Sequence, residues 1–291
     1  MAEGTLVGRY REVFGLRRET PLTEGQVRHH LELETRLSHE LRASATAARW
    51  EAFERCYDRL YSELPWLVGT GGVANPAMWS RLIGPPGSRV YEVGSGAGEL
   101  AVGLAEAGYL ITATDVSRQR GDRVQRPNLT WATTDGVHLD HFAVPGSFEA
   151  VISNQVVEHL HPDDLDSHLR SARSLLAPGG RYAFATPHRL TGPHDVSKVL
   201  ELDAPGGMHL REYRNIEMVR ALRHAGFHRV RSVQYSPRLY PHPIPSRLHL
   251  WIMLSLEAGL DRASVSRARA IARRLRGPLR LDVFLIAERD R

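Results

Sequence analysis

Apolar residues recur at helical spacing along the first part of the chain. Two such series run over residues 31–41 and 50–64. Residues three or four positions apart lie on one face of a helix, so each series predicts an amphipathic helix. Pro65 and a glycine-rich stretch then end the pattern. We therefore predict a helical cap over residues 1–84.

The pattern changes after residue 84, where short apolar runs alternate with helical stretches. Such alternation is typical of a parallel sheet with helices on both faces. The predicted fold is α/β, a doubly wound, Rossmann-like sheet of seven strands. The runs predict strands at 89–93, 109–114, 129–133, 148–153, 181–186, 228–235 and 281–287, and helices at 98–107, 155–160, 163–176 and 215–224.

A long segment separates the last two predicted strands. It contains a proline-rich stretch and one or two helical patterns, and a bare loop of this length is uncommon. We interpret it as a substrate lid or as a contact between two copies in a homodimer. The predicted division is a cap at 1–84, a core at 85–236, a helical insertion at 237–279 and a final core strand at 280–291.

Cysteine content and hydropathy restrict the compartment. Cys56 is the one cysteine among 291 residues, so no disulfide framework can form within the chain and a reducing compartment is expected. No apolar stretch has the length of a membrane span, and the first residues do not form a signal peptide. We expect a cytoplasmic protein with no membrane partner.

The basic charge is carried almost wholly by arginine. The net charge is +5, and acidic residues are interspersed with basic ones. One arginine cluster lies at residues 267–280 and could contact nucleic acid or an anionic substrate. A solvated helix face explains it more simply, so we do not expect a nucleic-acid partner.

The run from Val90 to Glu99 reads as a buried strand, a glycine-rich turn and the start of a helix. Its glycines at 94, 96 and 98 let the backbone turn sharply and approach a ligand without a Cβ in the way. A second strand then closes on Asp115. A carboxylate there can accept hydrogen bonds from two adjacent ribose hydroxyls. The pattern predicts a nucleotide-type ligand at the ends of the first two core strands.

The spacing of this loop differs from the dinucleotide fingerprint, which requires a small residue where Glu99 stands. Glu92, just before the loop, suits a cationic or amine-bearing ligand better than a pyrophosphate. The run from Glu92 to Gly98, taken with Asp115, resembles the cofactor site of class I S-adenosylmethionine (SAM) methyltransferases. The resemblance covers residues 80–235 and the last strand, and implies SAM as the cofactor with the helical cap over the substrate side.

The resemblance also implies where the rest of the SAM site lies. In this family an acidic or polar residue after the third strand binds the adenine amino group, which points to Asp135. Asn154 follows the fourth strand, where the chain would pass the methyl donor. Ligands of open α/β sheets bind at the carboxyl ends of strands where strand order reverses, which gathers these positions into one pocket. The residues expected to bind SAM are Glu92, Gly94, Ser95, Gly96, Gly98, Asp115, Val116, Asp135, Gly136 and Asn154.

A polar set follows the fourth strand. Gln155, Glu158 and His159 stand at i, i+3 and i+4 of a predicted helix, which would place them on one face. With His209 they resemble the metal sites of ubiquinone-pathway O-methyltransferases and of small-RNA 2′-O-methyltransferases, although Gln155 replaces an acid. The implied cation is Mg²⁺ or Mn²⁺, which would lower the pKa of an acceptor hydroxyl. Alternatively, these polar groups only cap a helix.

A metal-free alternative lies after the fifth strand. His188 and His194 precede Asp195 in a polar loop, and a histidine beside a carboxylate can act as a general base near neutral pH. The candidate catalytic residues are thus Glu158, His159, His188 and His194. The loop could equally be a polar turn.

The need for a base or metal favours a hydroxyl acceptor. The stretch from Thr186 to Phe227 resembles bacterial methyltransferases that act on sugars, so we expect a small-molecule or oligosaccharide acceptor. Several members of one set of side chains could line a sugar-stacking cleft, although core packing is the simpler interpretation for most of them: Trp50, Trp66, Trp79, Tyr240, His242 and Trp251. The alternatives are 2′-O-methylation of RNA and a non-catalytic SAM-binding partner protein.

Overall fold

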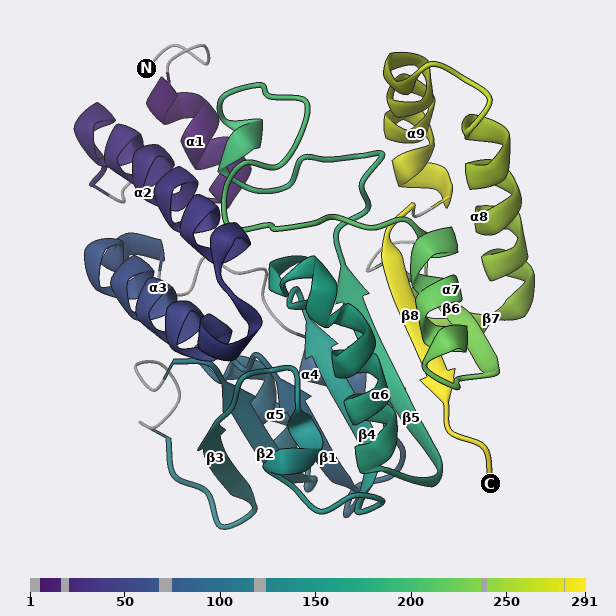
Figure 1. Ribbon diagram of the computed structural model, residues 1–291. Coiled ribbons are helices and arrows are strands. Elements are labelled where there is room, and N and C mark those ends of the chain that lie inside the picture. Colours follow the sequence, from purple (N-terminus) through teal and green to yellow (C-terminus); the bar gives the residue numbers. More distant parts are fainter. Residues whose placement is uncertain (1–5, 17–20, 68–74, 118–123, 237–239, 280) are drawn as a thin grey trace.

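The computed structural model describes residues 6–16, 21–67, 75–117, 124–236, 240–279 and 281–291. Eight strands of this described part form one sheet in the order β3-β2-β1-β4-β5-β8-β6-β7 (Figure 1). The strands are β1 (Arg89–Val93), β2 (Leu110–Asp115), β3 (Leu129–Thr133), β4 (Phe148–Asn154), β5 (Leu176–Thr186), β6 (Arg229–Ser236), β7 (Tyr240–Ser246) and β8 (Val283–Glu288).

Strands β1 to β5 are parallel to one another, whereas β8 runs antiparallel to both β5 and β6. This confirms the predicted doubly wound α/β fold, with one strand more than the seven expected. The additional strand is β7, which lies in the stretch interpreted as an insertion and pairs with β6 at the sheet edge. Its prolines at 241, 243 and 245 donate no backbone hydrogen bonds, which an edge strand tolerates, and they hid the strand in the sequence.

Helices cover both faces of the sheet. Leu169 on α6 and Leu222 on α7 are buried against one face, and Leu104 on α5 and Trp79 on α4 against the other. Among the described residues, no helix is both long enough and apolar enough to span a bilayer. The helices are α1 (Leu6–Phe14), α2 (Glu24–Ala43), α3 (Arg49–Glu63), α4 (Pro76–Ser80), α5 (Glu99–Glu106), α6 (Leu165–Leu175), α7 (Asn215–His224), α8 (Arg247–Leu260) and α9 (Val265–Leu279).

Helices α1, α2 and α3 lie beyond the carboxyl ends of β4 and β5 (Figure 1). Leu37 of α2 and Cys56 of α3 share an apolar cluster with Met208 and Leu210. These last two residues belong to the segment that precedes α7. The N-terminal helices therefore pack on a loop from the second half of the chain.

The predicted helix at 155–160 is wrong. Only a 3-10 turn, Val157–His159, forms there, and Gln155 before it has a positive φ of 58°. Pro162 explains the interruption, because a residue that precedes proline is driven from helical into extended backbone. Both Leu160 and His161 are extended, and α6 starts at Leu165.

A buried carboxylate joins α8 to the core. Glu257 is fully buried, and its oxygens accept hydrogen bonds from the backbone N–H groups of Asn215 and Ile216 and from Nε2 of His188, at 2.8–2.9 Å. It thus caps the N-terminus of α7 from another helix. Burial alone would raise the pKa of Glu257, but His188 and these donors outweigh it, and the net shift is downward.

We predict that Glu257→Leu lowers the free energy of unfolding by about 3–5 kcal/mol, because it leaves buried donors without an acceptor. Glu257→Gln should retain part of this stability. Urea denaturation measures the loss, and Glu51→Leu at an exposed position of α3 is the control. Equal denaturation midpoints for Glu257→Leu and wild type would contradict the capping role.

Candidate functional site

A cavity of about 370 Å³ opens at the carboxyl ends of β1, β2, β3 and β4, beneath the N-terminal helices. The parallel register places these strand ends at one level, since Val93 pairs with both Thr114 and Ser153. The candidate cofactor residues on its wall are Glu92, Gly94, Ser95, Gly96, Asp115, Val116, Asp135, Gly136 and Asn154.

The glycine loop is shaped by two close approaches. Gly94 has a positive φ of 67°, and a Cβ there would lie 2.5 Å from Val156. Gly98 has a φ of 82°, and a Cβ there would lie 2.3 Å from the Trp131 ring on β3. Gly98 does not line the cavity. Its expected contact with the cofactor is therefore corrected to packing between the start of α5 and the sheet.

Asp115 holds the glycine loop as well as facing the cavity. Its Oδ2 accepts a hydrogen bond from the Gly96 N–H at 2.8 Å, and its Oδ1 accepts one from the Ser117 N–H at 3.1 Å. Asp115 therefore ties the glycine loop to the end of β2 at the cavity wall. Asp135 also lines the cavity, but its Oδ1 accepts hydrogen bonds from the backbone N–H groups of Val137 and His138, and its Oδ2 contacts Nδ1 of His138 at 2.7 Å.

Glu92 is a buried acid at the cavity wall. Its side chain is 3% exposed, and among the described residues its Oε2 has no hydrogen-bond partner. Burial, with a smaller contribution from the charge of Asp115, raises the pKa of Glu92 to about 8. A cationic group in the cavity would offset the cost of ionising this carboxylate.

The cap supplies a wall of the cavity that the sequence did not reveal. Its members are Glu34 from α2 and Phe53, Tyr57, Leu60 and Tyr61 from α3. The helical periodicity marked α3 as amphipathic, but not which partner its apolar face covers. Tyr57 lies edge-on to His159 with a centroid distance of 6.2 Å, so the cap reaches the other candidate residues.

The aromatic residues expected to line a sugar cleft lie elsewhere. Trp50 stacks edge-on to Phe142, Trp79 is in the core beneath the sheet, and Trp251 is 65% exposed on α8. None of the five described side chains of that set lines the cavity, and the Tyr240 side chain is outside the described part. The core position of Trp79 and the packing of Trp66 against the cap cluster agree with the simpler interpretation, that most of these side chains pack in the core.

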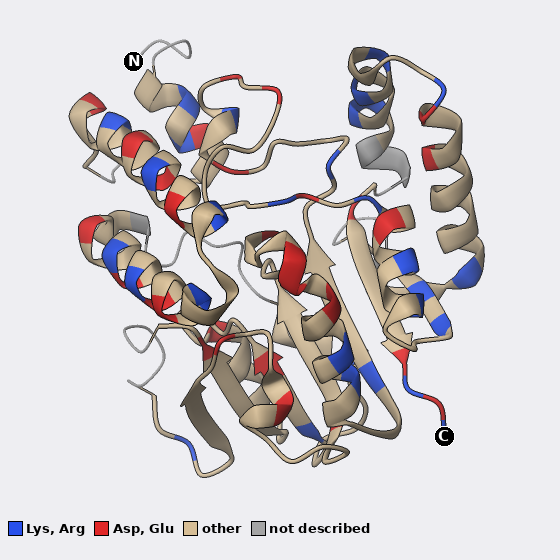
Figure 2. Ribbon diagram, in the orientation of Figure 1, with Lys and Arg blue, Asp and Glu red and all other residues tan. Residues whose placement is uncertain are grey.

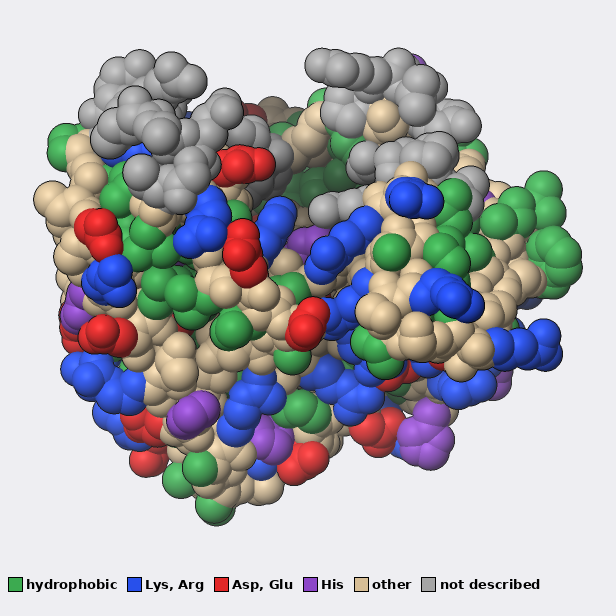
Figure 3. Space-filling view, turned by 90° about the horizontal axis from the view of Figure 1, so that it is seen from above, with side chains coloured by type: hydrophobic (Ala, Val, Ile, Leu, Met, Phe, Trp, Pro, Cys, Tyr) green, Lys and Arg blue, Asp and Glu red, His purple; other side chains and the backbone are tan. Residues whose placement is uncertain are grey.

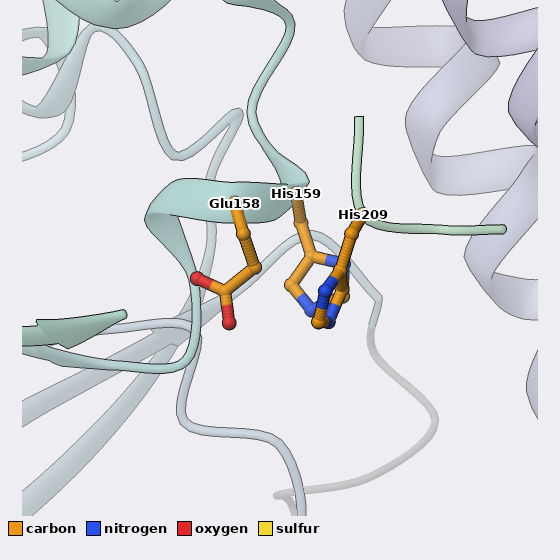
Figure 4. Close-up of side chains that lie close together, drawn as sticks. All are labelled: Glu158, His159 and His209. Atoms are coloured by element: carbon orange, nitrogen blue, oxygen red, sulfur yellow. The ribbon is translucent and has the colours of Figure 1, made fainter. Parts of the chain in front are cut away.

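Three candidate metal ligands converge beside the cavity (Figure 4). One ligand atom each of Glu158, His159 and His209 lies within 4.8 Å of the others. The two former come from the 3-10 turn, and His209 comes from the segment before α7. His159 lines the cavity, whereas Glu158 and His209 are not among its lining residues. The prediction that Gln155, Glu158 and His159 share one face of a helix was wrong, because no helix forms there. The 3-10 turn nevertheless places the adjacent Glu158 and His159 close together.

The remaining atoms of these side chains are held by neighbours. Nδ1 of His159 donates to the Met208 carbonyl at 2.9 Å, and Nδ1 of His209 donates to Glu212 at 3.0 Å. A cation would therefore bind at Nε2 of each ring, and His209 would lose its Nε2 proton on binding. Thr186 donates to Oε2 of Glu158, whose buried Oε1 has no hydrogen-bond partner among the described residues. This donor set fits a divalent cation.

The three groups have strongly shifted pKa values. Burial raises the pKa of Glu158 to about 7 against the opposing influence of His209. Burial and the neighbouring His209 lower the pKa of His159 to about 3, which keeps its imidazole neutral. Burial would lower the pKa of His209, but Glu212 and Glu158 raise it to about 9.

The other catalytic candidates do not line the cavity. His188 is fully buried, and both ring nitrogens are used, Nε2 by Glu257 and Nδ1 by the Leu190 N–H at 3.2 Å. The structure therefore argues against His188 as a base. His194 is partly buried and its Nε2 contacts the Thr191 hydroxyl at 2.9 Å. Gln155 lines the cavity, but its left-handed backbone removes it from the predicted helix face.

Two described arginines of the 267–280 cluster are engaged within the chain. Arg269 pairs with Asp203, and Arg273 donates to the Gly192 carbonyl. Charges of both signs are distributed over the ribbon and over the face seen from above (Figures 2 and 3). Arg280 and the Arg276 side chain lie outside the described part.

Known sequences resemble this chain over part of its length. A family model described as a methyltransferase domain matches residues 76–232. The ubiquinone biosynthesis O-methyltransferase of Chromobacterium violaceum is 30% identical over 159 residues, which make up 48% of this chain and 64% of that protein. The enzyme of the same name from Bordetella avium is 26% identical over 219 residues, 67% of this chain and 82% of that protein.

Solved structures share the fold. Phosphoethanolamine N-methyltransferase 2 of Haemonchus contortus, in complex with S-adenosyl-L-methionine, superposes with a TM-score of 0.52 at 17% identity, covering 86% of this chain and 61% of that one. The Burkholderia thailandensis 1,6-didemethyltoxoflavin-N1-methyltransferase gives 0.52 at 16% identity, with coverage of 85% and 92%.

We predict that Glu92→Gln stabilises the ligand-free protein increasingly as the pH rises. A pKa raised by folding means that the stability contributed by Glu92 is present at low pH and is lost as the pH rises toward 8. The unfolding temperature of the variant minus that of wild type should therefore grow between about pH 5 and about pH 8. Glu99→Gln, at an exposed neighbouring position, is the control.

Proposed function

The chain belongs to the family of S-adenosylmethionine-dependent methyltransferases, and we propose that it transfers the methyl group to a hydroxyl oxygen with the help of a divalent cation. The observation that carries this proposal is the convergence of Glu158, His159 and His209 beside the cavity at the strand ends. A hydroxyl is a weak nucleophile toward a sulfonium methyl, and it needs a means of losing its proton.

In this proposal each group of residues at the site has a separate role in binding SAM or the cation. Asp115 would accept the ribose hydroxyls of SAM while it keeps the glycine loop in place. Glu92 would face the cationic end of SAM. Glu158, His159 and His209 would hold Mg²⁺ or Mn²⁺, with the histidine tautomers fixed by Met208 and Glu212. When bound, the cation would lower the pKa of the acceptor hydroxyl.

For the acceptor we propose a hydroxyl of a sugar, glycoside or glycosylated small molecule. The cap side of the cavity supports this choice, because the rings of Phe53, Tyr57 and Tyr61 line it. Aromatic faces suit the apolar face of a sugar ring.

A second candidate is a ring hydroxyl of a catechol-type compound. The names of the curated relatives favour it, since they are ubiquinone biosynthesis O-methyltransferases. Sugars and catechols both offer neighbouring oxygens to a cation, so the cation site alone supports either. RNA is less favoured, because acids and bases are mixed on the surface.

We predict that Asp115→Ala weakens SAM binding by about 100-fold, as expected for two lost hydrogen bonds to a charged group. Isothermal titration calorimetry measures the affinity. Asp166→Ala on α6 is the control, because its side chain is half exposed and outside the cavity. Unchanged SAM affinity in Asp115→Ala would contradict the placement of the cofactor.

We predict that EDTA abolishes methyl transfer and that Mg²⁺ or Mn²⁺ restores it. His159→Ala and His209→Ala should each lower kcat by about 100-fold or more while SAM affinity stays within a few-fold of wild type. Transfer from labelled SAM to a panel of glycosides, catechols and RNA measures the rate. His224→Ala is the control, because this side chain at the end of α7 is exposed.

The panel also separates the alternatives. Metal-dependent methylation of catechols alone would replace the sugar proposal. Turnover that resists EDTA but is lost in His194→Ala would replace the cation with a loop base. SAM binding without transfer to any acceptor would favour the non-catalytic partner protein.

A further inference from the structure

The segment that carries His209 is held by the cap from the other end of the chain. Oε2 of Glu34 on α2 accepts a hydrogen bond from the Met208 N–H at 3.2 Å, across 174 positions of sequence. Arg42, near the C-terminus of the same helix, donates to the His209 carbonyl at 3.1 Å. Figure 1 shows the segment before α7 running past this end of α2.

Glu34 is itself fixed in the cap. Its side chain is buried, and Oε1 contacts Nε2 of His30 at 2.7 Å. The other ring nitrogen of His30 contacts the Tyr10 hydroxyl, to which the Trp66 indole donates at 3.3 Å. A buried chain of hydrogen bonds therefore runs from α1 through α2 to Met208, and it holds the Glu34 carboxylate in one orientation.

Met208 connects this chain to the candidate cation ligands. The Met208 N–H is held by Glu34, and the Met208 carbonyl accepts from Nδ1 of His159 at 2.9 Å. The next residue is His209. The backbone of Met208 thus orients the ring of His159 and leads directly into His209. Glu34 in turn holds the backbone of Met208 in place.

The packing around Gly207 points to the same contact. A Cβ at Gly207 would lie 2.4 Å from Oε2 of Glu34, 2.6 Å from Val196 and 2.9 Å from Asp195. Only glycine lets the backbone come close enough for the Met208 N–H to reach Glu34. By contrast, a Cβ at Gly206 would meet Ser197 Oγ at 3.4 Å, an ordinary contact.

We propose that Glu34 is a positioning residue for the cation site, which docks the segment 207–209 on the cap and thereby sets His159 and His209 in their ligating geometry. This inference rests on the proposed cation. Substituting a residue that holds a metal-ligating histidine from outside the ligand shell typically lowers metal affinity 10- to 100-fold. The cap would then assemble the site as well as cover it.

The test measures Mn²⁺ affinity of the full-length protein by electron paramagnetic resonance of the free ion, with SAM affinity measured in parallel. Glu34→Ala should weaken Mn²⁺ binding about 10- to 100-fold and leave SAM affinity within about threefold. Glu34→Gln should rescue most of the loss. Its amide oxygen can accept from Met208 while its NH₂ donates to His30 in the other tautomer, which the Tyr10 hydroxyl accommodates.

The two glycines give an independent, matched pair. Gly207→Ala should weaken Mn²⁺ binding like Glu34→Ala although Glu34 is retained, and Gly206→Ala should behave as wild type. Agreement of Glu34→Ala with Gly207→Ala supports docking of the segment, because the two substitutions share only this contact.

Three outcomes would overturn the inference. Unchanged Mn²⁺ affinity with a raised KM for the acceptor would make Glu34 an acceptor-binding residue. Parallel loss of Mn²⁺ affinity, SAM affinity and unfolding temperature would reduce it to a general support of the cap. If wild type itself binds no Mn²⁺, the proposed function has failed first, and that result appears before any substitution is made.

Discussion

The parallel register of β1 with β2 and β4 is the constraint on which the site depends. Because Val93 lies level with Thr114 and Ser153, the strands β1, β2 and β4 end side by side. The residues that follow them, Gly94, Asp115 and Asn154, consequently face one cavity. A slip in the pairing would move these residues along the sheet edge and separate the loop from the acid that holds it.

Buried carboxylates show where this fold tolerates an unfavourable charge. The oxygens of Glu257 are hydrogen-bonded to the N-terminus of α7 and to His188. Those of Glu34 are hydrogen-bonded to His30 and to the Met208 N–H. Glu92 and Glu158 differ, since each has an oxygen without a partner among the described residues. An unpaired buried carboxylate costs free energy. The fold places these two at the cavity wall and beside it, where the positive charge of a ligand would offset that cost.

Much of the fold could be predicted from local pattern. The strands at 89–93 and 129–133 and the helix at 215–224 have the predicted bounds, because apolar runs and glycine turns act over a few residues. The same holds for the glycine loop and Asp115. Where local rules compete, the predictions failed: Pro162 shortened the helix after β4 to a turn, and the prolines of β7 concealed an edge strand.

The sequence by itself determined the doubly wound sheet and the strand-end pocket, which follow from residue type and spacing. Its resemblance to the metal sites of known methyltransferases made Glu158, His159 and His209 candidates. Only the tertiary structure decided that α2 and α3 wall the pocket, that Gly98 packs on Trp131 and that His188 is used by Glu257. These contacts join segments far apart in the chain. The periodicity of the sequence cannot predict these contacts, because they depend on how the helices pack against loops and strands that are distant in the sequence.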